Sequence, residues 1–330
     1  MRPPAFWFLP PDKPALAARL LAPLAGLTSA LTSRRVVRPP SHRAGVPVLC
    51  LGNLTVGGSG KTPSAIALME HVSARGLTGA AFLSRGYGGR LAGPVRVDPL
   101  RHSAADVGDE PLLLSAFAPT WVARDRAAGA RAAEAAGARA IVMDDGFQNP
   151  ALARDLSIVV VDAATGFGNG RCLPAGPLRE PVAAGLARAQ ALLLIGNPAE
   201  RAAFAALWSD LPLPLLEAEL RPLPTGMEWA GARVLAFAGI GRPAKFFATL
   251  ADLGAHVAGA VPLDDHQPLG NALLRRLEAE AAALGAQLVT TEKDAARLPP
   301  GWRQRVLTVP VRLAVRDWSP LDAELARIGL

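Results

Sequence analysis

A glycine-rich turn that ends in Gly-Lys-Thr carries the clearest chemistry in this sequence. It follows a short apolar run at 46–51 and consists of Thr55, Val56, Gly57, Gly58, Ser59, Gly60, Lys61 and Thr62. In such a turn the backbone N–H groups curl around phosphate oxygens, ahead of a helix whose positive end faces the same anion. Lys61 would reach the β- and γ-phosphates of a nucleotide, and the Thr62 hydroxyl would hold Mg²⁺. The turn therefore predicts a P-loop.

One position departs from the usual P-loop pattern of G-x-x-x-x-G-K-[ST]. Thr55 stands where the first glycine is expected, although the later glycines keep the backbone freedom that the loop needs. A plain turn between strand and helix is the alternative. Gly-Lys-Thr directly after a predicted strand favours phosphate binding over that alternative.

A pair of carboxylates supplies the expected metal side of the same site. A buried strand is predicted at 138–143, and it ends in Asp144, Asp145, a glycine and, two residues on, Gln148. A carboxylate at the end of a strand downstream of a P-loop is the Walker B arrangement that holds Mg²⁺. Asp162 also ends a predicted strand and is the competitor, but the paired carboxylates and the glycine turn favour Asp144 and Asp145.

Two further stretches place polar side chains at the ends of predicted elements. A strand at 78–84 leads into a glycine-punctuated loop with Arg85 and Tyr87, the only tyrosine. Loops that follow parallel strands lie on the ligand-binding edge of an α/β sheet, so we predict a binding role for both residues. A plain turn is the alternative. Asp109 opens the next predicted helix, where capping is the role expected from sequence physics alone.

The composition limits the class of protein. The 330 residues, half of them hydrophobic, can bury large cores and suggest two domains. Two cysteines, Cys50 and Cys172, form no disulfide framework and indicate a reducing, cytosolic setting. Despite a net charge of +7, aromatic residues are sparse and no basic stripe interleaves with them, so nucleic acid is not expected as a partner. Lysine is scarce beside arginine and is expected where a compact charge is needed, at Lys13, Lys61, Lys245 and Lys293.

The N-terminal segment 1–44 holds most of the net charge. Its seven basic residues against one acid contribute +6 of the total +7. At helical spacing the leucines of 16–31 fall on one side, with Phe6, Trp7 and Phe8 before them and arginines after them. This pattern favours an amphipathic helix at an anionic membrane surface, with an ordinary helix packed on its own domain as the alternative. Arg19 and Pro23 interrupt it, and spanning a bilayer takes about 20 apolar residues.

Alternating apolar strands and helices predict an α/β fold that positions these side chains. We expect a P-loop NTPase-like parallel sheet flanked by helices over 45–225 and a smaller α/β domain over 226–330. An amphipathic membrane-surface helix over 1–44 precedes them. The domain junction is placed by a cluster of prolines between 212 and 224.

The motifs together resemble the tetraacyldisaccharide 4′-kinase family of the lipid A pathway. The resemblance runs in order from about residue 5 to 298, and the stretches that carry it are the P-loop, 84–88, 108–111, 144–148, 174–180, 236–247, 265–266 and 291–294. It implies an enzyme that transfers the γ-phosphoryl group of ATP, with Mg²⁺, to the 4′-hydroxyl of an acylated glucosamine disaccharide 1-phosphate. It also implies a peripheral position on the cytoplasmic face of the bacterial inner membrane, and no obligate protein partner is evident.

The resemblance also assigns roles to individual residues. Asp109 matches a catalytic aspartate and His266 a histidine that pairs with it, with Lys61 as the third catalytic group. Asp144, Asp145 and Gln148 match the metal side of the family, and Tyr87 matches a residue near the reacting phosphate. Asn149 departs from the family, which usually has histidine there.

Rival functions belong to other classes. A P-loop GTPase of the metallochaperone type needs an [NT]-K-x-D motif and a metal-binding Cys or His cluster. In residues 291–294 the lysine and aspartate are adjacent, and no such cluster occurs. A kinase for a soluble sugar or nucleotide does not explain the amphipathic N-terminus, and a purely structural membrane protein does not need the P-loop.

Overall fold

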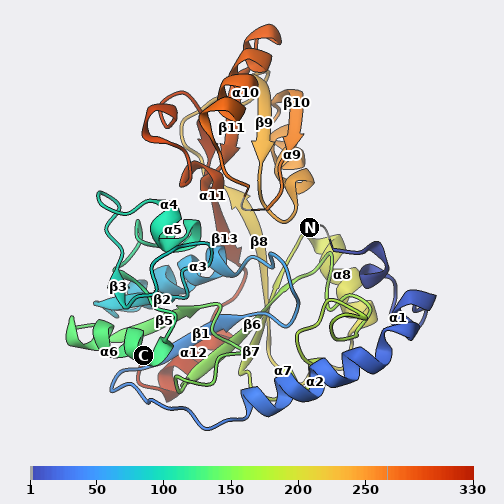
Figure 1. The fold of residues 1–330 in the computed structure, drawn as a ribbon, viewed down its shortest axis with the longest axis vertical. Coiled ribbons are helices and arrows are strands. Elements are labelled where there is room, and N and C mark those ends of the chain that lie inside the picture. Colours follow the sequence, from blue (N-terminus) through green and yellow to red (C-terminus); the bar gives the residue numbers. More distant parts are fainter. Residues whose placement is uncertain (1–2, 266) are drawn as a thin grey trace.

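The computed structural model describes residues 3–265 and 267–330, and its largest feature is a nine-stranded sheet (Figure 1). The strands run in the order β13-β8-β7-β6-β1-β5-β2-β4-β3. Neighbours are parallel except at the two edges, where β3 and β13 pair antiparallel with β4 and β8. The bounds are β1 Val48–Gly52, β2 Ala80–Ser84, β3 Val95–Arg96, β4 Thr120–Val122, β5 Ala140–Asp144, β6 Leu156–Asp162, β7 Ala191–Ile195, β8 Leu215–Pro222 and β13 Val311–Val315.

Helices cover both faces of this sheet. They are α3 Lys61–Ala74, α4 Ala104–Val107, α5 Asp109–Leu114, α6 Arg126–Ala135, α7 Val182–Leu186, α8 Pro198–Leu207 and α12 Ser319–Arg327. The strands β1, β2, β5 and β7 are buried along their whole length, as expected for a parallel sheet between two helical layers. Alternate residues of β1 enter opposite cores: Cys50 packs with residues of α6 and α8, and Leu51 with residues of α3 and α12. The expected α/β fold with a mostly parallel sheet is confirmed.

A smaller parallel sheet of four strands stands above the large one in Figure 1. Its order is β10-β9-β11-β12, with β9 Arg233–Ala238, β10 His256–Pro262, β11 Gln287–Thr291 and β12 Leu307–Val309. The helices of this unit are α9 Pro243–Asp252, α10 Asn271–Ala283, α11 Glu292–Ala295 and the 3-10 turn η2 Pro300–Trp302. Phe246 packs on one face of the sheet and Leu277 on the other, so this unit has its own pair of cores.

The end of the chain returns to the large sheet. β13 pairs with β8 from Val311 to Val315, and Leu321 and Leu325 of α12 enter the core beneath α3. This differs from the expected unit at 226–330, because the smaller sheet ends at Val309. The antiparallel partner of β13 lies some ninety residues earlier in the chain, so the sequence pattern could not assign this strand to its sheet.

The N-terminal segment lies along the outside of the large unit (Figure 1). It forms the 3-10 turn η1 Ala5–Phe8 and the helices α1 Leu16–Leu20 and α2 Ala22–Val36, with Pro23 in the first turn of α2. Five leucines of the expected apolar face are more than half exposed: Leu16, Leu20, Leu24, Leu27 and Leu31. Among the described residues, no helix is both long and apolar enough to cross a membrane.

Candidate active site

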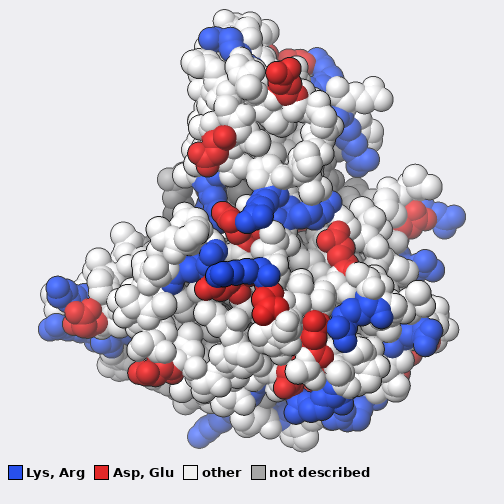
Figure 2. Space-filling view, turned by 180° about the vertical axis from the view of Figure 1, so that it is seen from behind, with Lys and Arg blue, Asp and Glu red and all other residues white. Residues whose placement is uncertain are grey.

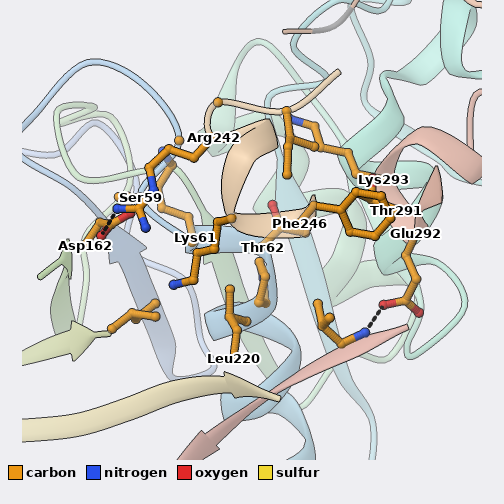
Figure 3. Close-up of a pocket in the computed structure, with 18 of the residues that line it drawn as sticks. Ser59, Lys61, Thr62, Asp162, Leu220, Arg242, Phe246, Thr291, Glu292 and Lys293 are labelled. Atoms are coloured by element: carbon orange, nitrogen blue, oxygen red, sulfur yellow. Dashed lines mark hydrogen bonds and ion pairs between the residues drawn. The ribbon is translucent and has the colours of Figure 1, made fainter. Parts of the chain in front are cut away.

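A cavity of about 230 Å³ lies between the two sheets, above the predicted P-loop (Figure 3). The large unit contributes Ser59, Lys61 and Thr62 to its lining, and the smaller unit contributes Arg242 and Lys293. Three of the four lysines of the chain, those at 61, 245 and 293, line it. Figure 2 shows basic and acidic side chains gathered along the seam between the upper and lower units. Five Lys or Arg side chains and three Asp or Glu side chains line the cavity, and this excess of positive charge suits a polyanionic ligand.

The P-loop joins β1 to α3 with two glycines in the left-handed region. Gly57 has φ 105° and Gly60 has φ 88°, conformations that strain other residues. A Cβ on Gly60 would also lie 2.7 Å from the end of the Ile195 side chain. The Lys61 side chain is 11% exposed at the start of α3, where the helix dipole adds to its charge. The predicted phosphate-binding residues therefore form one cradle.

The carboxylates at the end of β5 face this cradle. The Thr62 hydroxyl donates to Asp144 Oδ2 at 3.3 Å, and Lys61 Nζ lies 3.9 Å from Asp145 Oδ1. Burial raises the pKa of Asp144 to about 7, with the nearby charge of Glu110 acting in the same direction. Asp145 has φ 56°, so the chain turns sharply between the two carboxylates. Asp162, the competing strand-end carboxylate, pairs with Arg242 at 2.8 Å instead.

The arrangement around Asp144 suits a hydrated divalent cation. Asp144 Oδ1 and Asp145 Oδ1 are buried and accept no hydrogen bond within the described part of the chain. Over residues 3–265 and 267–330, no three His, Cys, Asp or Glu side chains group to hold a metal unaided. Two carboxylates and a hydroxyl nevertheless fit Mg²⁺, which keeps several waters and takes its other ligands from nucleotide phosphates.

Gln148 and Asn149 make structural contacts. The Gln148 amide donates to the carbonyl of Asn53 at 2.8 Å and to Glu180 at 3.1 Å, and its oxygen faces Arg179 at 3.5 Å. Gln148 therefore ties the start of the P-loop to the segment after β6. Asn149 accepts a hydrogen bond from the backbone of Ala151 at 2.8 Å, which closes a turn.

Asp109 lies at the start of α5, buried with 3% of its surface exposed. Its Oδ1 accepts a hydrogen bond from the backbone N–H of Glu110 at 3.0 Å. The N-cap of α5 is Gly108, so the capping role expected from sequence physics is wrong. Gly108 has φ 94°, and a Cβ there would lie 2.6 Å from the Tyr87 carbonyl oxygen. This close approach brings the Tyr87 loop against the start of α5.

The smaller unit places cations against these acids. Lys293 pairs with Glu110 at 3.2 Å and with Asp265 at 3.6 Å. Burial acts to lower the pKa of Lys293, but the carboxylates of Glu110, Asp109 and Asp265 outweigh it and raise that pKa. Arg297 Nε lies 3.7 Å from Asp109 Oδ2. His266, the predicted partner of Asp109, lies outside the described residues.

A second contact joins the turn after β9 to the P-loop. Arg242 pairs with Asp162 at 2.8 Å and with Glu200 at 3.5 Å, and Figure 3 shows the first of these at the edge of the cavity. A Cβ on Gly58 would lie 4.0 Å from Gly241 Cα, so the two turns nearly touch. The units are therefore closed over the cradle.

The loop after β2 holds Arg85 and Tyr87 at the surface, and 65% of Tyr87 is exposed. A buried arginine that the sequence analysis missed, Arg126, lies nearby at the start of α6 and donates to the Ala123 carbonyl at 2.7 Å. Burial lowers its pKa, as does the charge of Arg85, while Asp145 and Asp144 oppose this. The Arg126 guanidinium therefore lies near enough to feel the charges of both Arg85 and the carboxylate pair.

Sequence reasoning expected the smaller unit to contribute His266, but it missed Arg242, Arg297 and the contacts of Lys293. In the large unit these residues meet acids that precede them by 42 to 188 positions. A local signal existed in residues 291–294, where an acid, a lysine and an aspartate follow a strand. That signal could not show which carboxylates the cations would meet.

Comparison with known proteins agrees with this geometry. The tetraacyldisaccharide-1-P 4′-kinase family matches residues 17–328. Tetraacyldisaccharide 4′-kinase of Dinoroseobacter shibae is 64% identical over 98% of this chain and 97% of its own, and that of Jannaschia sp. is 55% identical over 99% of each.

A solved structure has the same fold. The crystal structure of LpxK from Aquifex aeolicus in complex with ATP superposes with a TM-score of 0.75, at 24% identity, over 96% of this chain and all of that one. The sequence matches extend over both units and the cavity between them. The chain therefore belongs to the tetraacyldisaccharide-1-P 4′-kinase family.

Proposed function

We propose that this protein is an ATP-dependent kinase that phosphorylates the 4′-hydroxyl of tetraacyldisaccharide 1-phosphate in lipid A biosynthesis. Membership of the family supports the reaction. The observation that carries the proposal is the cradle itself. Lys61 lies 3.9 Å from Asp145, and the Thr62 hydroxyl lies 3.3 Å from Asp144. Asp109 is buried beside them, beneath the smaller unit.

The reaction exchanges one phosphorus–oxygen bond for another. The 4′-oxygen forms a bond to the γ-phosphorus, the bond from that phosphorus to the β–γ bridging oxygen breaks, and ADP leaves. The hydroxyl proton passes to the dyad of Asp109 and His266. Lys61 and the backbone N–H groups of 55–62 neutralise charge on the phosphates.

Thr62, Asp144 and Asp145 are the residues that would hold Mg²⁺, with Gln148 supporting the loop beside them. When bound, Mg²⁺ neutralises and orients the β- and γ-phosphates. The raised pKa of Asp144 fits this role, because a cation at that point offsets the cost of burying the carboxylate. Arg85 and Tyr87 are proposed to contact the acceptor, since their loop abuts the start of α5.

The two units have different parts in the proposed reaction. We propose that the large unit binds the nucleotide and the acceptor, and that the smaller unit closes over them through Lys293, Arg297 and Arg242. Closure excludes water from a phosphoryl group that would otherwise be hydrolysed. The apolar side chains of Ile66 and Phe246 line the same cavity and suit the nucleotide base.

A membrane role for α1 and α2 completes the proposal. An acceptor with four acyl chains resides in a bilayer, and the five exposed leucines form an apolar face beside arginines at 19, 34, 35 and 38. Such a face inserts into the boundary of an anionic leaflet and leaves the rest of the protein in water. We propose the cytoplasmic face of the inner membrane as this surface.

The kinase assay measures transfer of label from [γ-³²P]ATP to tetraacyldisaccharide 1-phosphate in detergent micelles with Mg²⁺. We expect Lys61→Ala and Asp109→Ala to lower transfer by at least about 100-fold, because one removes phosphate neutralisation and the other part of the dyad. Lys13→Ala, outside the cavity, is the control and should match the wild type. Nucleotide hydrolysis by the wild type without labelled lipid would contradict the proposal and favour the chaperone-type NTPase.

Vesicle binding tests the N-terminal face. Replacing Leu24 and Leu27 by glutamate should abolish co-sedimentation with vesicles that contain anionic lipid, because two charges then enter the apolar face. Replacing the exposed Leu100, which lies outside this face, by glutamate is the matched control and should leave co-sedimentation unchanged. Equal sedimentation of both variants would count against membrane docking by α2.

A further inference from the structure

We propose that Arg297 is a positioning residue for Asp109. In the closed arrangement its guanidinium holds the Asp109 carboxylate ionised and oriented toward the acceptor. The inference rests on the proposed function, in which ionised Asp109 serves in proton removal. It adds a residue of the smaller unit to the catalytic machinery of the large one.

A cation beside the Asp109 carboxylate matters because this residue is almost completely buried. Only 3% of the residue is exposed, and Glu110 N–H donates to Oδ1 at 3.0 Å. Burial without compensating charge favours the protonated form of a carboxylic acid, which cannot accept a proton. Arg297 Nε lies 3.7 Å from the other oxygen, Oδ2.

Arg297 is held rigidly by contacts on its own unit. One terminal nitrogen donates to the Gln267 carbonyl at 2.7 Å, and the other contacts Asp294 and the Gly239 carbonyl. Asp294 is fully buried and is itself held by the backbone N–H of Gly239 and by the Thr291 hydroxyl at 2.7 Å. The guanidinium therefore has little freedom to turn away from Asp109.

These anchors use the two terminal nitrogens and leave Nε facing Asp109. Nε is buried and forms no hydrogen bond within the described residues, and a shift of under 1 Å would bring Asp109 Oδ2 within hydrogen-bonding distance. A second cation, Lys293, pairs with Glu110 and Asp265, and the charge of Asp109 also acts on it. Arg297 adds to the positive charge around Asp109, and its Nε is the buried donor that faces Oδ2.

Because Arg297 and Asp109 belong to different units, the stabilisation of ionised Asp109 depends on closure of the two units. Asp109 belongs to the large unit, and Arg297 follows α11 in the smaller one. An open arrangement would withdraw the guanidinium, so the ionised form of Asp109 is favoured when the site is closed around both substrates. This coupling would restrain proton transfer in the open enzyme.

The test is a double-mutant cycle on the full-length enzyme, measured as 4′-phosphorylation in micelles. We expect Arg297→Gln to lower kcat about 10- to 100-fold with little change in the KM for ATP, because charge and orientation at Asp109 are lost but the phosphate cradle is intact. Arg297→Lys keeps the charge and should fall between Arg297→Gln and the wild type. Arg305→Gln, an exposed arginine of the same unit paired with Glu278, is the control and should keep the wild-type kcat.

The Asp109→Ala background decides whether Arg297 acts through Asp109. There Arg297→Gln should have no further effect on the residual rate. A loss of equal size in that background, or a wild-type kcat for Arg297→Gln, overturns the inference. If Arg297→Gln does not fold, Arg297→Lys replaces it in the cycle, and its smaller loss must likewise vanish.

The same cycle separates the inference from the proposed function. A wild-type rate for Asp109→Ala would defeat the role of Asp109 and the inference with it. A severe loss of kcat in Asp109→Ala, together with a wild-type kcat in Arg297→Gln, would contradict the inference alone. The proposed kinase function would then still hold.

Discussion

Burial sets the protonation of individual carboxylates in this site, and Asp144 shows it most clearly. Its side chain is fully enclosed, and its pKa rises to about 7 mainly because burial disfavours the charged form. The Thr62 hydroxyl and the Lys61 charge oppose the rise without cancelling it. An acid that titrates near neutrality links cation binding to pH, since the cation must displace the proton.

This shift predicts a pH-dependent stability for the metal-free protein. The pKa of Asp144 is higher folded than unfolded, so between about pH 4 and 7 the folded state binds more protons and stability falls as pH rises. Asp144→Asn removes the titration. We expect it to stabilise the protein at pH 8 by on the order of a few kcal/mol, and progressively less as pH falls toward 4.

Thermal unfolding in EDTA at pH 8, 6.5 and 5 checks this expectation. Asp155→Asn serves as the control, since its carboxylate is partly exposed and receives hydrogen bonds from Arg43 and from the backbone of Val48. A gain in unfolding temperature of Asp144→Asn over the wild type that is the same at all three pH values would contradict the expectation.

At the scale of elements, the junction of β1 with α3 depends on glycine conformation. Gly60 is the N-cap of α3, with φ 88° and the Ile195 side chain 2.7 Å from a built Cβ. Gly76 follows α3 with φ 96°, and a Cβ there meets nothing within 4 Å. The two glycines share backbone strain but differ in their surroundings.

Alanine at each position separates the two effects. Both variants should lose about 1–2 kcal/mol of stability, because an L-residue is strained in the left-handed region. Gly60→Ala should also weaken ATP binding in calorimetric titration, because the strained residue lies within the cradle, whereas Gly76 lies beyond the other end of α3. Wild-type affinity in Gly60→Ala, or lost affinity in Gly76→Ala, would show that the P-loop does not depend on Gly60 in this way.

At the scale of the whole molecule, ion pairs across the seam hold the two units together. Arg242 reaches Asp162 and Glu200, and Lys293 reaches Glu110. These pairs connect the turn after β9 and the start of α11 to the ends of strands and helices in the large unit. Partly exposed pairs of this kind are individually weak, but together they bias the molecule toward the closed arrangement.

Removing Arg242 should make the closed arrangement of the two units less favourable. Arg242→Ala is expected to raise the KM for ATP about fivefold, equivalent to about 1 kcal/mol, because a partly exposed pair contributes little more. Small-angle scattering should show a larger radius of gyration than in the wild type. Arg221→Ala, which removes an exposed pair with Glu219 on β8, should change neither quantity; equal effects of the two variants would contradict a closing role for Arg242.

The sequence by itself determined the elements that carry chemistry locally. A P-loop and a strand-end carboxylate pair have signatures within a few residues, because glycine conformation and the exit of a buried strand are local properties. The fold class, the place of the glycine turn between β1 and α3 and the exposed leucine face of the N-terminal segment followed from such patterns. The family resemblance rested on the same local motifs.

The tertiary structure alone decided which distant groups meet. It assigned β13 and α12 to the large sheet, made Gly108 rather than Asp109 the cap of α5, and placed Arg297 against Asp109 across 188 residues of chain. No local pattern encodes these contacts, because strand pairing and ion pairing between units depend on register and packing over the whole chain. The physical reason is that the energy of a buried charge is set by its surroundings, which exist only once the chain has folded.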